Sequence, residues 1–260
     1  MTKNYYYLAS ALPDLHIGNP PDLNFASFDE LLKTNLTSED YRQVSVIRRY
    51  YDINNIRAFW LGGQLDPHGV YNAIELEESL LTQEGFPEYV FAFLEKYSQL
   101  DERLQRFPAL ITEYFRHEVA AASGFLRDYL TFEREWRLVF TGFRAKKLGR
   151  DIAVELQFED PNDDIVAQIL AQKDAVDYIP PVRYHHLRAL FESHAEAPLD
   201  LHQALCDYRF HRLETMYSIH VFSIDRILAY LAQLVIVEKW MELDRQKGKT
   251  VIETIVREAL

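Results

Sequence analysis

Apolar side chains recur at spacings of three and four residues along almost the whole chain, which is the pattern of amphipathic α-helices. Residues 37–63 show this most clearly, because four bulky side chains there share one helical face: Tyr41, Val44, Ile47 and Tyr51. Thr37 or Ser38 is the expected N-cap of this helix, and Gly62 with Gly63 is its expected end. We therefore predict an all-α protein.

Capping and breaking residues bound the other expected helices. Their starts are expected near Asp29, at Pro87, at a cap formed by Asp163 or Asp164, and after Pro180–Pro181. Ser123–Gly124 is a candidate break inside the long helical stretch 109–148, and residues 153–158 fit either a short strand or the tail of a helix. The chain has only 9 glycines and 10 prolines in 260 residues and no glycine- or serine-rich linker. We expect residues 1–260 to form a single all-helical domain.

Charge narrows the classes of partner. The chain has 28 Lys and Arg against 40 Asp and Glu, a net charge of −12. General nucleic-acid binding requires a basic surface, so this balance argues against it. An acidic protein attracts basic partner surfaces instead.

We expect neither a membrane span nor a secretory signal from the sequence. The opening MTKNYYYLAS lacks a long apolar core, and the apolar run 227–237 is about half of the ~20 residues that spanning requires. This run is expected to be a buried helix of a cytoplasmic protein. The single cysteine, Cys206, excludes an internal disulfide and fits a reducing compartment.

Three segments share a plan in which a polar residue among bulky neighbours comes late in a long helix that ends near glycine. They are YYDINNIRAFWLGG (50–63), FEREWRLVFTGFRAKKLG (132–149) and VIVEKWMELDRQKG (235–248), with Asn55, Glu135 and Glu238 as the polar residues. Their unequal separations do not fit a solenoid repeat but fit three related lobes around a common axis. A chance match between amphipathic helices is the alternative.

These segments carry a resemblance to a known family. YYYLASAL, YDINNIRAF, LTFEREWRLVF and YLAQLVIVEKW together resemble the C-type subunit of the V-type (A/V-type) rotary ATPases, whose eukaryotic form is the d-type subunit. In that family each of three repeats has a helix with an E/N-hydrophobic-R triplet, matched here by Asn55-Ile56-Arg57 and Glu135-Trp136-Arg137. The third copy departs, with Glu238-Lys239-Trp240, and the chain is shorter than typical members. The aromatic opening followed by LPDL is also similar to an uncharacterised bacterial family encoded beside V-type ATPase subunits.

The resemblance implies a non-catalytic rotor protein of the central stalk without a cofactor. Such a protein has three helical lobes, sits on the membrane rotor ring, holds the foot of the central shaft and transmits torque for proton or other ion transport. It would be cytoplasmic and associated with the membrane through other subunits. The expected partner-binding residues are Asn55, Arg57, Glu135, Arg137 and Glu238.

Two features of the segment 132–149 lead to further expectations, namely Glu135 with Trp136 and the cations at its end. Trp136 is expected to anchor its helix in a core, with Glu135 tying neighbouring helices or meeting a basic partner. The cations that end the segment complement the negative pole of a helix, and either contact partners or are simply solvated: Arg144, Lys146, Lys147 and Arg150.

The alternatives are a helical-bundle metalloenzyme with iron or zinc, and a helical adaptor unrelated to the ATPase. The candidate metal-binding pairs are Glu113–His117, His185–His186 and His211–Glu214. The chain lacks the Glu-x-x-His pairs of diiron bundles, the His-Glu-x-x-His zinc motif and the phosphate-binding glycine loops. Cys206 lies near His202 and His211, but a buried structural cysteine is the commoner arrangement. We therefore expect no catalytic activity and no metal site.

Overall fold

The computed structural model describes the backbone of residues 4–216 and 220–258, and the side chains of these residues up to 243. About two thirds of the chain is helical, and the described residues contain no strand. The all-α prediction is confirmed. The helices are α1 (Tyr6–Ser10), α2 (Phe25–Asn35), α3 (Ser38–Trp60), α4 (Ala73–Thr82), α5 (Glu88–Lys96), α6 (Leu100–Ala121), α7 (Gly124–Lys147), α8 (Ile152–Glu155), α9 (Asp164–Leu170), α10 (Leu187–Ser193), α11 (Pro198–Glu214) and α12 (Ile224–Glu258), with a 3-10 turn at Val182–Tyr184.

Side-chain caps explain where several helices begin. The Thr37 hydroxyl accepts a hydrogen bond from the backbone N–H of Asp40 at 3.2 Å, and Asp163 accepts from the N–H groups of Ile165 and Val166. Both caps agree with the sequence prediction. The break in the stretch 109–148 is also confirmed, since α6 ends at Ala121 and α7 begins at Gly124.

Three predicted boundaries were wrong. Helix α2 begins at Phe25, because Asn24 caps it, and not near Asp29. Helix α5 begins at Glu88, one residue after Pro87. The expected end near Gly248 is absent, since α12 continues to Glu258. One glycine costs a helix only about 1 kcal/mol, which does not by itself end it. The ambiguous residues 153–158 form α8 and a following turn.

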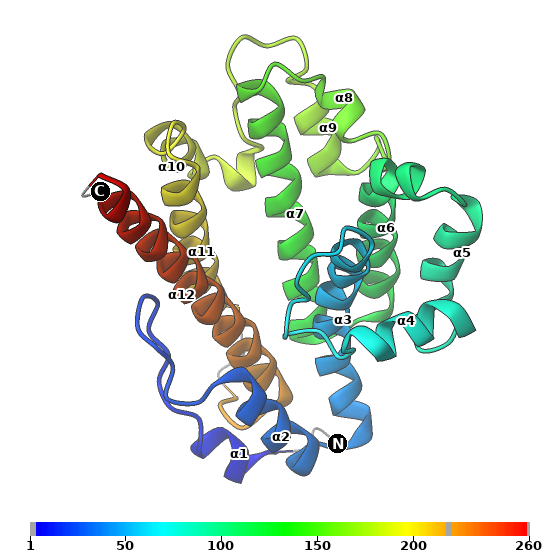
Figure 1. Cartoon of the computed structure of the whole chain (residues 1–260), viewed down its shortest axis with the longest axis vertical. Coiled ribbons are helices and arrows are strands. Elements are labelled where there is room, and N and C mark those ends of the chain that lie inside the picture. Colours follow the sequence, from blue (N-terminus) through cyan, green and yellow to red (C-terminus); the bar gives the residue numbers. More distant parts are fainter. Residues whose placement is uncertain (1–3, 217–219, 259–260) are drawn as a thin grey trace. The chain divides into compact units, whose positions relative to one another are not determined.

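The chain divides into two compact units. The first unit combines residues 1–42 and 192–260, so it is built from the two ends of the chain. Helices α11 and α12 pack side by side, and α2 packs on α12 through Phe28 and Tyr230, whose ring centroids are 5.1 Å apart (Figure 1). The apolar run 227–237 of α12 is buried throughout and forms the core of this unit.

The second unit is the continuous segment 43–191. Helices α6 and α7 lie side by side, α5 packs on α6, and α8 and α9 pack on α7 (Figure 1). Trp136 of α7 is buried, as expected of an anchor, and its indole N–H donates to Glu133 at 3.1 Å. The arrangement of three lobes around an axis stays a prediction.

Within the part of the chain that the structure describes, no helix is long and apolar enough to cross a membrane.

Candidate partner-binding site

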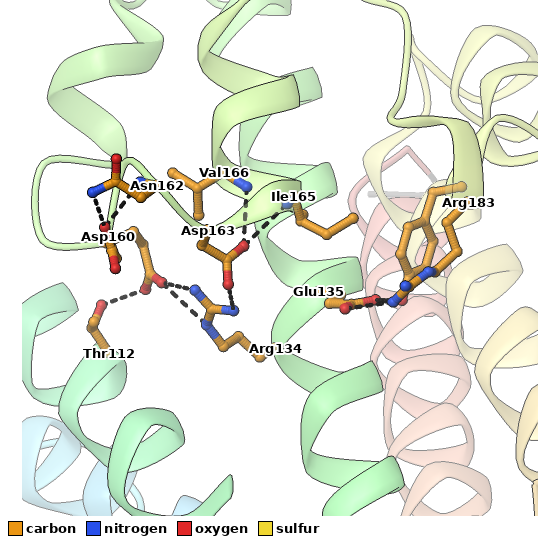
Figure 2. Close-up of polar contacts among 11 residues, drawn as sticks. Thr112, Arg134, Glu135, Asp160, Asn162, Asp163, Ile165, Val166 and Arg183 are labelled. Atoms are coloured by element: carbon orange, nitrogen blue, oxygen red, sulfur yellow. Dashed lines mark hydrogen bonds and ion pairs between the residues drawn. The ribbon is translucent and has the colours of Figure 1, made fainter. Parts of the chain in front are cut away.

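The two matching triplets lie on α3 and α7 in the second unit, and the first residue of each is buried. The Asn55 side chain donates to the carbonyl of Asp66 at 2.9 Å and accepts from its N–H at 2.7 Å. Glu135 accepts from Arg183 at 2.7 and 2.8 Å and from the Tyr184 hydroxyl at 2.9 Å (Figure 2). Both residues therefore fix other segments of their own unit.

The third residue of each triplet faces a different environment. Arg57 and Arg137 line the same cavity of about 250 Å³, which is bounded by α3, α6, α7, α8 and residues 158–159. The Arg137 guanidinium carbon lies 4.4 Å from the ring centroid of Tyr50 and 4.8 Å from that of Trp136, and Arg137 also donates to Glu133 at 2.7 Å. The exposed Arg57 lies 5.7 Å from the ring centroid of Phe107. The structure thus brings the two arginines to one cavity.

A larger groove of about 700 Å³ lies between α6 and α7 and shares five lining residues with this cavity: Thr112, Phe115, Arg134, Phe158 and Glu159. Arg134 lines both the groove and the cavity. Its guanidinium donates to Glu159 at 2.6 and 3.1 Å and to Asp163 at 2.9 Å, while Thr112 donates to the other oxygen of Glu159 at 2.6 Å (Figure 2). Since Asp163 also caps α9, these contacts connect α6, α7 and α9.

Arg134, which lines both the cavity and the groove, stays positively charged. Burial lowers the pKa of Arg134, but the carboxylates of Glu159 and Asp163 outweigh that effect, so its pKa lies above the usual value. Arg134 is neutralised by the two carboxylates and does not offer a free charge to a ligand. Arg137 is likewise paired with the buried Glu133, so the exposed Arg57 is the arginine of this cavity that remains for recognition. Guanidinium groups bind carboxylates through paired hydrogen bonds, so the cavity can accept an acidic side chain.

The third segment lies in the first unit. The Glu238 carboxylate accepts from the backbone N–H of Phe25 at 2.7 Å, at the first turn of α2. A carboxylate there stabilises the positive end of the helix. The ring of Trp240 lies 3.5 Å from the position that a Cβ on Gly18 would take. Glu238, like Asn55 and Glu135, thus has a partner inside its own unit.

The cationic end of α7 is only partly solvated. Lys146 donates to the carbonyls of Lys173 and Ala175 at 2.6 Å each, which attaches the segment after α9 to α7. The side chain of Arg150 pairs with Glu155 at 3.3 Å, and Arg144 lies over the ring of Phe140. These cations therefore contribute to local structure.

The candidate metal-binding residues do not form a metal centre in the part of the chain that is described, where no cluster of three or more His, Cys, Asp or Glu side chains could hold a metal ion. Glu113 lies 3.4 Å from His117 and also pairs with Arg116 on the surface of α6. Cys206 is a buried free thiol in α11.

Sequence reasoning missed Arg134 and two buried residues of α3, Arg48 and Asp52. Arg48, Asp52 and Asn55 lie at spacings of four and three, so they share one helical face. Three polar residues on one helical face that has to be buried are a signal in the sequence. That signal could have identified Arg48 and Asp52. Burial raises the pKa of Asp52 to about 6, although the N–H groups of Tyr71 and Val70 and the charges of Arg48 and Arg49 act in the opposite direction.

Comparison with known proteins identifies the family. Residues 1–259 match the family described as "Protein of unknown function (DUF2764)". An uncharacterized protein of Chlamydia trachomatis is 30% identical over 253 residues, covering 95% of each chain, and one of Chlamydia pneumoniae is 30% identical over 257 residues, covering 96% of this chain and 97% of the relative. No solved structure matches significantly. The match over nearly the whole length shows that the chain belongs to the DUF2764 family.

Proposed function

We propose that this chain is a non-catalytic central-stalk subunit of a V-type ATPase, which links the shaft to the membrane rotor ring. The observation that carries the proposal is the convergence of Arg57 and Arg137 on one cavity. These are the equivalent residues of the two triplets that resemble the C-type subunit family. Two related helices that use their first polar residue internally and direct their arginine to a shared cavity form one recognition surface.

The chemistry of this surface favours an acidic segment of a shaft subunit as the ligand. Arg57 is exposed, and Arg137 is held in place by Glu133 and two aromatic rings. Apolar side chains of Phe107, Ile111 and Leu156 line the same cavity. A carboxylate next to an aliphatic or aromatic side chain matches this combination, and its binding weakens with salt because the charges are screened.

Polar contacts between distant segments of the second unit also support a torque-transmitting role. Buried and partly buried polar contacts join segments that are distant in sequence, as Glu135 does with residues 183–184 and Arg134 does with α9. A coupling element must resist deformation, and satisfied buried networks restrict the relative movement of the segments they join.

Purification of the tagged protein from its own cells at low salt tests the proposal. Rotary ATPase shaft or rotor-ring subunits are expected in the purified complex, identified by mass spectrometry. Arg57→Gln should reduce shaft recovery, whereas Arg42→Gln, which removes an exposed arginine of the first unit, should not. Absence of all rotary ATPase subunits from the wild-type sample would contradict the assignment and favour an unrelated helical adaptor.

A further inference from the structure

Three buried polar side chains of α3 hold the backbone that leads into α4. Arg48 donates to the carbonyls of His68 and Gly69, and Asp52 accepts from the N–H groups of Val70 and Tyr71 at 2.7 and 3.1 Å. Asn55 forms its pair of hydrogen bonds with Asp66. The backbone of residues 66–71 is thus bound to one face of one helix.

This attachment requires a close approach at Gly69. A Cβ at this position would lie 2.5 Å from the Asp52 carboxylate and 2.7 Å from the Asn55 side-chain nitrogen. No side chain fits there without moving the polar residues of α3. Glycine therefore permits the direct contact between the segment and the helix.

Both ends of α4 are also fixed. Asn72 and Glu75 form a reciprocal capping box at its start, and Gln83 ends it in the left-handed conformation with a φ of 57°. Leu76 and Ser79 are buried on the inner side. The orientation of α4 is therefore set before any partner binds.

The outer side of α4 carries both exposed apolar side chains and exposed carboxylates. Ile74 is 77% exposed and Leu81 is 78% exposed, and their spacing of seven residues places them on one face, two turns apart. The exposed Glu77 and Glu78 lie between them, and the described residues provide no ion-pair partner for either. Two large aliphatic side chains are thus held in water beside two uncompensated carboxylates.

We propose that this face of α4, defined by Ile74, Glu77, Glu78 and Leu81, docks a basic amphipathic segment of a partner protein. Apolar side chains of the partner would cover Ile74 and Leu81, and its lysines or arginines would pair with the glutamates. Charge complementarity selects this occupant. An anionic membrane surface would be repelled by the two carboxylates, and a second copy of this face would bring four carboxylates together. The proposal does not depend on the ATPase assignment, because this face shares no residue with the Arg57 and Arg137 cavity.

The probe is a fluorescein-labelled helical peptide of leucine and lysine with all leucines on one face. Its binding to the full chain is followed by fluorescence anisotropy at two salt concentrations. The test variants are Ile74→Gln with Leu81→Gln, which removes the apolar contacts, and Glu77→Gln with Glu78→Gln, which removes the charges. Because all four residues are exposed, circular dichroism should show unchanged helix content in both variants.

Matched controls separate this face from general attraction to an acidic protein. Val176→Gln with Val182→Gln removes two other exposed aliphatic side chains of the same unit, and Glu95→Gln with Glu102→Gln removes two other exposed carboxylates. The apolar test variant should weaken peptide binding about ten-fold, and the charge variant should weaken it several-fold and reduce its salt dependence. The controls should change the affinity by less than two-fold, as changes outside an interface do.

Equal weakening by test and control variants would overturn the proposal, as would equally tight binding of a peptide with glutamate in place of lysine. Two further outcomes would replace the proposed occupant. Sedimentation with anionic phospholipid vesicles that is lost in Ile74→Gln/Leu81→Gln would indicate a membrane surface. A dimer in light scattering that this variant converts to monomer would indicate a second copy of the chain.

Discussion

Glu135 and Arg183 are joined through a single guanidinium nitrogen that lies 2.7 and 2.8 Å from the two carboxylate oxygens. The pair is asymmetric, because the Glu135 side chain is 10% exposed and that of Arg183 is 65% exposed. Tyr184, which is buried, donates to the same carboxylate. The carboxylate is therefore the common acceptor for a mostly solvated cation and a buried hydroxyl.

This asymmetry predicts unequal effects of removing the two partners. Glu135→Ala removes the carboxylate to which the buried Tyr184 hydroxyl donates and should lower the free energy of unfolding by about 1–3 kcal/mol. Arg183→Ala breaks a solvent-screened pair and should lower it by less than about 1 kcal/mol. Urea denaturation of both variants measures the difference. A larger loss for Arg183→Ala would show that the ion pair, and not the hydroxyl contact, carries the stability.

Trp136→Ala should be more destabilising than Glu135→Ala. The ring is 7% exposed, and its removal leaves a cavity at the position where Arg137 stacks. The expected loss is about 3–5 kcal/mol, as for other large-to-small substitutions in a core. Trp60→Ala, at a partly exposed tryptophan of α3, is the control and should cost less. A wild-type melting temperature for Trp136→Ala would remove its role as an anchor.

Asp52 predicts a pH dependence of stability. Its pKa is raised by burial to about 6 in the folded protein, whereas the usual value is 3.8. Between these two values the folded protein holds a proton that the unfolded chain has released, so stability falls as pH rises through this interval. The full effect of this group is about 3 kcal/mol.

Asp52→Asn isolates this contribution, because an amide oxygen still accepts from Val70 and Tyr71 but does not titrate. The free energy of unfolding of wild type relative to this variant should decrease from pH 4 to pH 6. Guanidinium chloride denaturation at several pH values checks this. A constant difference across the interval would mean that Asp52 titrates at its ordinary pKa.

The ion pair between Arg134 and Glu159 predicts that substitutions of the two residues have non-additive effects on stability. Arg134→Met leaves the Glu159 carboxylate, which is 9% exposed, without its charged partner, and should cost about 3 kcal/mol. Glu159→Gln in that background removes the uncompensated charge and should restore part of the loss. A double-mutant cycle measures the coupling, and additive effects of the two substitutions would show that the side chains between the groove and the cavity are not held by this pair.

The purified protein should contain no stoichiometric transition metal and should not hydrolyse ATP by itself. The basis is the sequence, which lacks the paired Glu-x-x-His residues, the zinc motif and the phosphate-binding loop. Elemental analysis and a phosphate-release assay are the measurements. About one iron or zinc per chain would favour the metalloenzyme alternative.

Local signals predicted the helices well, and distant contacts explain what they missed. The cap at Thr37 and the break before Gly124 depend only on neighbouring residues, so they could be read from sequence. The partners of Glu135 lie 48 and 49 residues further along the chain, and no local pattern indicates them. Glu135 was expected to tie helices or meet a basic partner, and the cation it meets belongs to its own unit.

In the candidate site, too, local spacing could be predicted from the sequence and tertiary packing could not. The spacing within each triplet was visible in the sequence, but which member of the triplet faces inward depends on how α3 and α7 pack. Asn55 is buried because the segment after α3 folds back onto it through Asp66, whereas Arg57, two residues further along the helix, is exposed. Periodicity gives the relative directions of side chains on one helix, whereas tertiary packing decides which direction is inside.

The joining of both ends of the chain in the first unit has a consequence for biosynthesis. Residues 43–191 leave the ribosome as a continuous stretch and can fold while translation proceeds. The N-terminal segment cannot complete its fold then, because the N–H of Tyr5 bonds to the carbonyl of Phe222 and that of Phe25 bonds to Glu238. At about 5–20 residues per second, this segment must wait on the order of ten to forty seconds for its partners to be synthesised. During that interval its apolar side chains, including Phe28 and Leu32, are exposed to chaperones and to neighbouring nascent chains.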